Sequence, residues 1–191
     1  MKIYFLRHGA TKLNEEGRLN GQIDEPLSSL GFEQAATAAE NVPKNVKTIR
    51  ASSMLRAVQT GRVISTALGI PLLSHDSLRE INMGSFAGKS WGGMDTGEDF
   101  KRIHRSMQFD YRKVGGESAQ EFRKRIIRFA NEVDGQYQDF ELLLVAHGGV
   151  QRLFDLLQGQ ENLAEIDNAV LLEFDLSKII KNANRSITPT R

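Results

Sequence analysis

The chain has 191 residues, of which 40% are hydrophobic and 26% are charged, a composition typical of a folded globular protein and not of a disordered one. Its 25 lysines and arginines nearly balance 24 aspartates and glutamates, which argues against a protein that binds nucleic acid through bulk positive charge. The absence of cysteine excludes disulfides and a thiolate nucleophile, and no apolar run approaches the roughly 20 residues of a membrane-spanning helix, so we expect one cytoplasmic domain over residues 1–191.

The N-terminal part of the chain begins with a predicted strand and continues with a predicted helix. Ile3–Leu6 is a continuous run of β-branched, aromatic and aliphatic residues, which is typical of a strand buried on both faces of a parallel sheet. Ser28 or Ser29 can cap the helix that follows. The side of that helix expected to face the core carries Phe32, Ala35, Ala36 and Ala39.

A second strand and helix are predicted farther along the chain. Val46–Ala51 has the composition of a short strand, and Ser52 or Ser53 after it can cap a helix. Gly69 is expected to end that helix, with Pro71 just beyond it. The residues expected to face the core are Leu55, Val58 and Ile64.

The second half of the chain holds an insertion and then returns to alternating helices and strands. Residues 84–116 are rich in glycine and follow neither the helical nor the strand period, so we expect a small helical lid there. A capping box at residues 118–121 opens a helix whose apolar side carries Phe122, Ile126, Phe129 and Val133. The remaining predicted elements are a strand at Leu142–Ala146, a helix at Val150–Gln158 ended by Gly159, a strand at Asn168–Leu176, and a frayed tail from Lys181 to Arg191.

Strands that alternate with helices predict a three-layer α/β/α sandwich around a mostly parallel sheet. Ligands of such sheets bind beyond the carboxyl ends of the strands, which is where His8 and His147 follow their strands. Each histidine precedes a glycine, which lets the backbone turn tightly and lets a ligand come close. If the two strands are neighbours, the two imidazoles share one pocket.

Two arginines are expected near the same pocket. Arg7 adjoins His8, and Arg56 lies near the start of the helix after Val46–Ala51, again on the carboxyl side of the sheet. A guanidinium group binds phosphate oxygens through a planar, permanently charged fork. Two histidines and two arginines around one crevice therefore favour a dianionic phosphate as the ligand. Taken alone, a histidine at a strand end could be structural and Arg56 could be a solvated helix residue.

Five short motifs occur in order between residues 3 and 152. They are Arg7-His8-Gly9-Ala10-Thr11 with Asn14, Gly21 and Asp24; Ser52 with Met54, Arg56-Ala57 and Gln59-Thr60; Leu78-Arg79-Glu80 with Gly84; Gly115-Gly116-Glu117-Ser118; and Val145-Ala146-His147-Gly148-Gly149 with Arg152. Together they resemble the motifs of the histidine phosphatase superfamily, the phosphoglycerate-mutase-like proteins. The compact chain is most similar to the phosphatase branch of that family.

The resemblance implies a phosphomonoester hydrolase that acts through a phosphohistidine intermediate on a small phosphorylated metabolite. It implies that His8 is the nucleophile and that Glu80 protonates the leaving oxygen and then activates water. The other expected site residues are Arg7, Arg56 and His147 at the phosphoryl group, and Asn14, Thr11, Asn20 and Gly148 around the substrate. Without the motif, the favoured interpretation of Glu80 is a surface carboxylate paired with Arg79. We expect no cofactor, no metal, no nucleic-acid or membrane partner, and a monomer or homodimer.

Two departures from the family leave the substrate open. Ala10 stands where the family usually has an acidic residue, and Phe86-Ala87-Gly88 stands where Trp-Glu-Gly is common. The basic segment 101–105, with Arg112 and Lys113, is either a solvated helix face or a site for a second acidic group of the substrate. Three alternative functions are phosphoglycerate mutase-type phosphoryl transfer, a phospholigand-binding protein without turnover, and a metal-dependent hydrolase. The last is disfavoured because the four histidines include no His-x-His or His-Glu-x-x-His pair.

Overall fold

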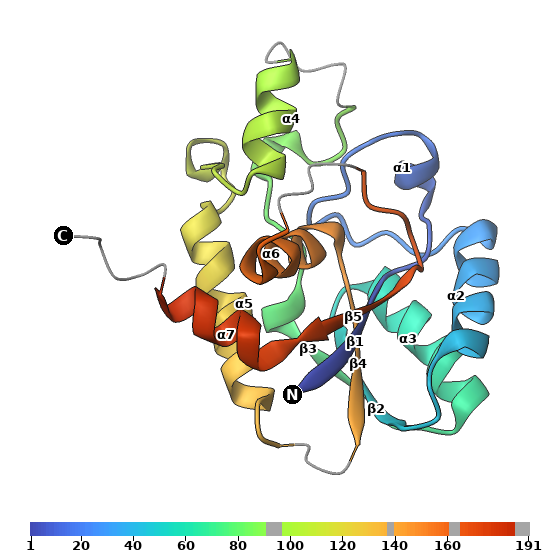
Figure 1. The fold of residues 1–191 in the computed structure, drawn as a ribbon. Helices are drawn as coiled ribbons and strands as arrows, with labels where there is room; N and C mark the ends of the chain where they lie inside the picture. The colour runs from blue at the N-terminus through green and yellow to red at the C-terminus, as the bar shows by residue number, and fades with distance from the viewer. Residues whose placement is uncertain (91–96, 137–139, 161–164, 186–191) are drawn as a thin grey trace.

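The computed structural model describes residues 1–90, 97–136, 140–160 and 165–185 (Figure 1). Within these ranges one five-stranded sheet has the order β3-β2-β4-β1-β5. Its strands are β1 Lys2–Arg7, β2 Val46–Ser52, β3 Leu72–His75, β4 Glu141–Ala146 and β5 Leu171–Asp175. The helices are α1 Lys12–Glu15, α2 Ser29–Asn41, α3 Leu55–Leu68, α4 Gly97–Arg105, α5 Ala119–Val133, α6 Gly148–Gln158 and α7 Leu176–Arg185. The first four strands are parallel and β5 runs antiparallel to β1, which confirms the predicted α/β fold with a mostly parallel sheet.

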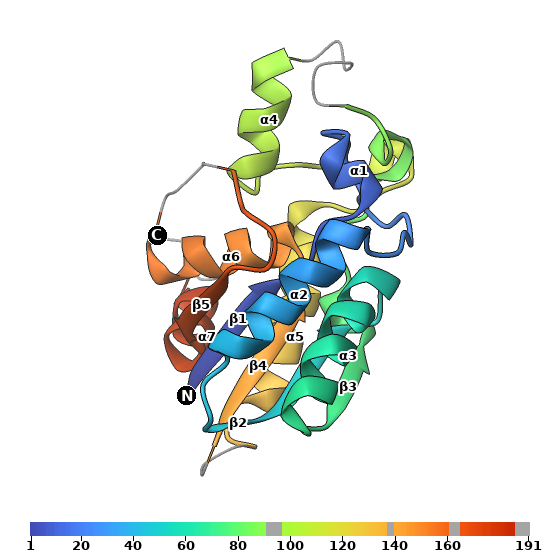
Figure 2. The same ribbon diagram turned by 90° about the vertical axis from the view of Figure 1, so that its right-hand side faces the viewer.

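Helices cover both faces of the sheet, so the molecule has two apolar cores. Alternate residues of β1 point to opposite faces: Ile3 and Phe5 pack with residues of α5, α6 and α7, whereas Tyr4 and Leu6 pack on the side of α2 and α3. Figure 2 shows α2 and α3 in front of the sheet. Burial on both faces explains why the central strands are continuous apolar runs without polar alternation.

The predicted core faces of two helices are partly wrong. Ser28 caps α2 as predicted, but Phe32 is 42% exposed, and the buried face consists of Gly31, Ala35, Ala38 and Ala39. In α3 the cap position is Met54 rather than Ser52 or Ser53, and Leu55 is 38% exposed. The two helices pack against each other and against the sheet through small residues. This close approach leaves the large side chains at the flanks of the interface.

The C-terminal end also differs from the prediction. The strand is shorter than Asn168–Leu176, and the chain continues as α7, which includes residues 181–185 of the predicted frayed tail. The buried residues of α7 are Leu176, Ile179 and Ala183, at helical spacing. Three buried positions among polar residues are too sparse a pattern to predict this helix from the sequence. Residues 186–191 of the predicted tail lie outside the described ranges.

The predicted lid insertion is described in part, because residues 91–96 lie outside the described ranges. It contains the 3-10 turn Gly84–Phe86, helix α4 and the 3-10 turn Arg112–Val114. Figure 1 shows α4 above the carboxyl ends of β1 and β4. An aromatic cluster holds this helix, made of Phe86, Phe100, His104, Phe109 and Tyr111. Among the described helices, none combines the length and the apolar character that crossing a membrane requires.

Candidate active site

His8 and His147 lie side by side because their strands are neighbours. The parallel register pairs Arg7 with Ala146, and the backbone N–H of His8 donates to the carbonyl of Ala146 at 2.9 Å. The two imidazole rings meet edge to face, with 5.2 Å between their centroids, and both side chains are buried. Residues separated by most of the chain therefore share one pocket beyond the carboxyl edge of the sheet.

The ring of His8 is held in one orientation and one tautomer. Its Nδ1 lies 2.7 Å from the carbonyl oxygen of Gly9, which can only accept, so Nδ1 carries the hydrogen and Nε2 carries the lone pair. Burial, and then the charges of Arg56 and Arg7, hold the pKa of His8 well below its usual value. At neutral pH His8 is therefore an uncharged imidazole with a nucleophilic Nε2. A Cβ atom on Gly9 would lie 2.3 Å from the carbonyl oxygen of Gly31, so glycine is required at this position.

Arg56 is a fully buried cation whose guanidinium group faces His8. Its Nε donates to Nε2 of His8 at 3.1 Å, and its two other nitrogens donate to the carbonyls of Ile23 at 2.7 Å and Gly21 at 2.9 Å. Burial lowers the pKa of Arg56 to about 10, so the group stays charged at neutral pH. Three directed bonds fix a positive charge beside the nucleophile before any substrate binds.

Arg7 and His147 complete the ring of donors around His8. Arg7 donates to the carbonyl of Ile166, while its buried Nε has no hydrogen-bond partner among the described residues. The Nε2 of His147 lies 2.7 Å from the hydroxyl of Ser52, and its buried Nδ1 is likewise without a partner in the described part of the chain. Buried polar atoms are normally satisfied, so unpaired atoms on both sides of His8 fit an anion bound there.

Glu80 faces the same pocket through a carboxylate that the backbone orients. Its Oε1 accepts from the N–H of Ile81 at 2.9 Å and its Oε2 accepts from the N–H of Gly149 at 3.2 Å. A Cβ atom on Gly149 would lie 2.3 Å from Oε1, so the carboxylate occupies the space that glycine leaves. Arg79, its alternative partner from the sequence, donates instead to the hydroxyl of Ser53 at 3.5 Å.

The pocket is a cavity of about 510 Å³, much larger than one phosphoryl group needs. Of the four residues expected around the substrate, Asn14, Asn20 and Gly148 line it. Thr11 is fully buried instead: it caps α1 and accepts a hydrogen bond from Nδ2 of Asn20 at 2.9 Å. Thr11 therefore does not line the cavity as expected, because its hydroxyl is used to hold the loop that carries Asn14 and Asn20.

The family model of the histidine phosphatase superfamily (branch 1) matches residues 3–177. The chain belongs to the histidine phosphatase superfamily. This confirms the resemblance seen in the motifs and makes the chain an enzyme of the class of phosphoric monoester hydrolases. Among the described residues of this histidine phosphatase, no group of three histidine, aspartate or glutamate side chains is placed to hold a metal ion.

Named relatives of this histidine phosphatase include hydrolases and mutases. A putative phosphoserine phosphatase 2 of Hydrogenobacter thermophilus is 34% identical over 183 residues, which cover 92% of this chain and 89% of that protein. A probable phosphoglycerate mutase of Enterobacter sp. is 33% identical over 150 residues, covering 78% and 70%. A solved mycobacterial glucosyl-3-phosphoglycerate phosphatase in complex with VO3 has a TM-score of 0.79 at 27% identity, over 90% of each chain.

Several supporting residues of this histidine phosphatase were not predicted for their roles. Ser52, expected as a possible helix cap, contacts His147. Thr60 accepts from the N–H of Gly9 at 3.0 Å, and Asn168 donates to the carbonyl of His8 at 2.8 Å. Ser52 and Thr60 stand within the second motif, which could have indicated them. Asn168 has no local signal, because only the return of the chain past β1 brings it to the site.

The basic segment 101–105 is divided by the structure. Arg102 pairs with Asp99 at 3.3 Å, and Arg112 pairs with Asp110, so these arginines belong to the solvated surface. His104 and Arg105 instead line the cavity, as do Arg7 of β1 and Arg56 of α3. Arg105 adds a positive charge to the lining, and Arg152 of α6 adds another.

His104 gives the stability of the protein a predictable pH dependence. Burial, and then the charges of Arg152 and Arg105, lower the pKa of His104 to about 3, whereas an imidazole in an unfolded chain has a pKa of about 6.5. Between these values the unfolded chain binds a proton that the folded protein does not bind. The free energy of unfolding therefore falls as the pH decreases through this window, by about 2 kcal/mol between pH 7 and pH 5 for His104 alone.

Urea unfolding of the wild type and of His104→Gln at pH 7 and pH 5 measures this effect. The variant loses the ring contacts of His104 and is expected to be less stable at both pH values. Its stability should nevertheless change less between them, because one proton-binding group has been removed from the unfolded chain. An equal pH-dependent loss in both proteins would contradict the assignment. His8, His75 and His147, whose pKa values are also lowered, contribute to the slope that remains.

Proposed function

We propose that this protein hydrolyses a small phosphomonoester through a phosphohistidine formed on Nε2 of His8. The observation that carries the proposal is the geometry around that atom. Nε2 carries a lone pair whose direction is set by the bond from Nδ1 to Gly9. It is flanked by the buried cation Arg56, by Arg7 and by the ring of His147. A phosphoryl group at this point meets a nucleophile and preorganised donors together.

The reaction has two displacement steps. In the first, the Nε2 lone pair of His8 bonds to phosphorus while the bond to the leaving oxygen breaks, and Glu80 gives that oxygen a proton. In the second, Glu80 takes a proton from a water molecule whose oxygen attacks phosphorus. The N–P bond then breaks, which returns neutral His8 and releases inorganic phosphate. Arg56 donates to the same lone pair in the free protein, so the phosphoryl oxygens take over this bond when substrate binds.

Glu80→Gln tests the acid role in this scheme. A phenolate such as p-nitrophenolate leaves readily without a proton, whereas an alkoxide does not. We compare kcat/KM, which reports phosphorylation of His8, because kcat also includes the hydrolysis of the phosphohistidine that all substrates share. We therefore expect kcat/KM for an alkyl phosphate to fall by about 10²–10⁴-fold and kcat/KM for p-nitrophenyl phosphate to fall by less than about 10-fold. Steady-state kinetics over a series of leaving groups gives the measurement. A uniform loss over the series would show that Glu80 acts in another way.

The cavity and the relatives together indicate the kind of substrate. The residues that line the space beyond His8 include the arginines Arg18, Arg105 and Arg152. Cations of this kind favour a substrate with a second anionic group, such as a carboxylate. The relatives are named for phosphoserine, phosphoglycerate and glucosyl-3-phosphoglycerate. We propose a phosphomonoester that also carries a carboxylate.

A panel of phosphorylated metabolites, assayed for phosphate release, tests the function directly. Carboxylate-bearing phosphomonoesters should give higher kcat/KM than neutral alkyl phosphates of similar size. Isomerisation of a phosphoglycerate without net phosphate release would show that the reaction is mutase-type transfer and not hydrolysis. Tight phosphate binding without turnover would show that the protein is a ligand-binding member of its family. One domain over residues 1–191, a cytoplasmic location, the absence of a nucleic-acid partner, and a monomer or homodimer stay predictions.

A further inference from the structure

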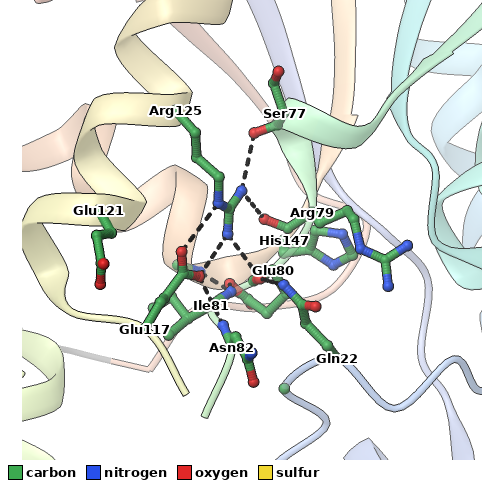
Figure 3. Close-up of polar contacts among 12 residues, drawn as sticks. Gln22, Ser77, Arg79, Glu80, Ile81, Asn82, Glu117, Glu121, Arg125 and His147 are labelled. Atoms are coloured by element: carbon green, nitrogen blue, oxygen red, sulfur yellow. Dashed lines mark hydrogen bonds and ion pairs between the residues drawn. The ribbon is translucent and has the colours of Figure 1, made fainter. Parts of the chain in front are cut away.

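The segment that carries Glu80 has no regular secondary structure of its own. Residues 79–83 join two 3-10 turns, Asp76–Leu78 and Gly84–Phe86. Backbone groups outside helices and sheets need other partners if they are to stay in one position. Figure 3 shows that the side chain of Arg125, from the middle of α5, provides these partners.

Arg125 uses all five of its N–H donors within a small volume. Two bonds form a fork to the carboxylate of Glu117, at 2.7 and 3.2 Å. The other three go to the backbone carbonyls of Ser77 at 2.9 Å, Arg79 at 2.5 Å and Glu80 at 2.9 Å. A planar guanidinium group is suited to this work because its donors have fixed relative directions.

Glu117 holds the other side of the same segment. Its Oε1 also accepts from the backbone N–H of Asn82 at 2.8 Å, and its own N–H donates to the carbonyl of Asn82 at 2.9 Å. The Arg125–Glu117 pair therefore binds the backbone on both sides of Glu80. The two side chains are 18% and 15% exposed, so water competes little for these bonds.

The position of the Glu80 carboxylate depends on this backbone. Oε1 accepts from the N–H of the next residue, Ile81, and Oε2 accepts from Gly149 across the pocket. A shift of residues 79–82 therefore moves one of the two donors and the side chain itself, while Gly149 stays fixed on α6. A partly buried ion pair contributes little net stability compared with apolar residues of the same size, so precise placement is a better reason for this cluster.

We propose that Arg125, paired with Glu117, is a positioning residue that sets the location of the Glu80 carboxyl group relative to the leaving oxygen. The inference rests on the proposed function, in which Glu80 is the general acid. Arg125 itself lies behind the Glu80 segment and does not line the cavity. Its loss should therefore weaken proton transfer to the leaving group and leave the attack by His8 largely unchanged.

The test is a double-mutant cycle read with two substrates. Arg125→Met should lower kcat/KM for an alkyl phosphate by about 10- to 100-fold, because a shift of about 1 Å at a reacting group has that effect. For p-nitrophenyl phosphate, which needs no acid, the loss should stay below about 3-fold. In the Glu80→Gln background, Arg125→Met should change neither rate by more than about 3-fold, since the group it positions is already absent. Arg125→Lys, which keeps the charge without the fork, should recover part of the alkyl phosphate rate.

A matched control separates positioning from stability. Arg123 lies on the same helix, is partly buried and donates to the carbonyl of Ala183 at 3.0 Å, far from the Glu80 segment. Arg123→Met should lower the Tm without slowing the alkyl phosphate more than p-nitrophenyl phosphate. If Arg125→Met does not fold, Glu117→Gln keeps the three carbonyl bonds and should show a smaller loss confined to the alkyl phosphate.

Two outcomes would overturn the inference in distinguishable ways. In the first outcome, Glu80→Gln slows the alkyl phosphate much more than p-nitrophenyl phosphate, but Arg125→Met and Glu117→Gln slow both substrates equally or keep their full effect in the Glu80→Gln background. The positioning role is then wrong and the acid role of Glu80 stands. In the second outcome, Glu80→Gln itself slows both substrates equally. The acid assignment is then wrong, and so is the inference that rests on it.

Discussion

Replacing His8 with alanine is expected to abolish turnover and the phosphoenzyme together. In the scheme the phosphoryl group bonds to Nε2 of His8, and the neighbouring His147, whose Nε2 is bonded to Ser52, contacts only the phosphoryl oxygens. Removal of a covalent nucleophile commonly costs about 10⁴-fold or more in kcat. The measurement is phosphate release in the steady state, together with trapping of labelled phosphoenzyme by an alkaline quench, since a phosphohistidine is labile in acid and stable in alkali.

The control for this variant is another histidine that ends a parallel strand. His75 is the last residue of β3, but it does not line the cavity and packs edge to face on Phe129. His75→Ala should keep its activity. His8→Ala should stay folded, because the imidazole that it removes is uncharged and Arg56 keeps its bonds to the carbonyls of Ile23 and Gly21. Undiminished hydrolysis or an alkali-stable phosphoenzyme in a folded His8→Ala protein would refute the assignment of the nucleophile.

Replacing Arg56 with lysine is expected to lower kcat by about 10²–10³-fold while the charge is kept. The guanidinium group donates in three directions at once, to His8 and to the carbonyls of Ile23 and Gly21. An ammonium group is a point charge on a flexible stem and cannot span these partners. The loss should fall mainly on kcat, because Arg56 stabilises the charge that spreads over the phosphoryl oxygens in the transition state.

Arg62→Lys is the matched control for this change. Arg62 lies on the same helix, is exposed, and is placed away from the cavity of His8. It makes the same chemical change without touching the site, so its kinetics should equal those of the wild type. Comparison of the two variants by kcat, KM and Tm separates transition-state stabilisation from general effects on α3. Wild-type kinetics for Arg56→Lys would mean that catalysis does not depend on the fixed donor directions of the Arg56 guanidinium group.

The central strands and the two histidines were predictable because their signals are local. Ile3–Leu6 and Leu142–Ala146 are buried on both faces, which requires apolar side chains at every position. A parallel sheet places all its strand ends at one edge, so His8 and His147 had to meet if β1 and β4 were neighbours. Helix caps and glycine stops such as Ser28, Ser118 and Gly69 are equally local and were found.

Other features depend on how the elements pack. Phe32 and Leu55 have the expected apolar character, yet close packing of α2 on α3 through alanine and glycine leaves them at the surface. Thr11 stands within the first motif but is turned inward to cap α1. Short elements such as α1 and β3 have too few residues to show a period, and α7 buries only every third or fourth residue.

The fold class, the family and the expected chemical roles of the residues at the strand ends could all be inferred from the sequence alone. Those properties follow from patterns a few residues long. The tautomer of His8, the partners of Arg56 and the hydrogen bonds from Arg125 to the Glu80 segment became known only from the tertiary structure. These depend on hydrogen bonds between residues that are distant along the chain, and hydrogen bonds are sensitive to fractions of an ångström that no local pattern encodes.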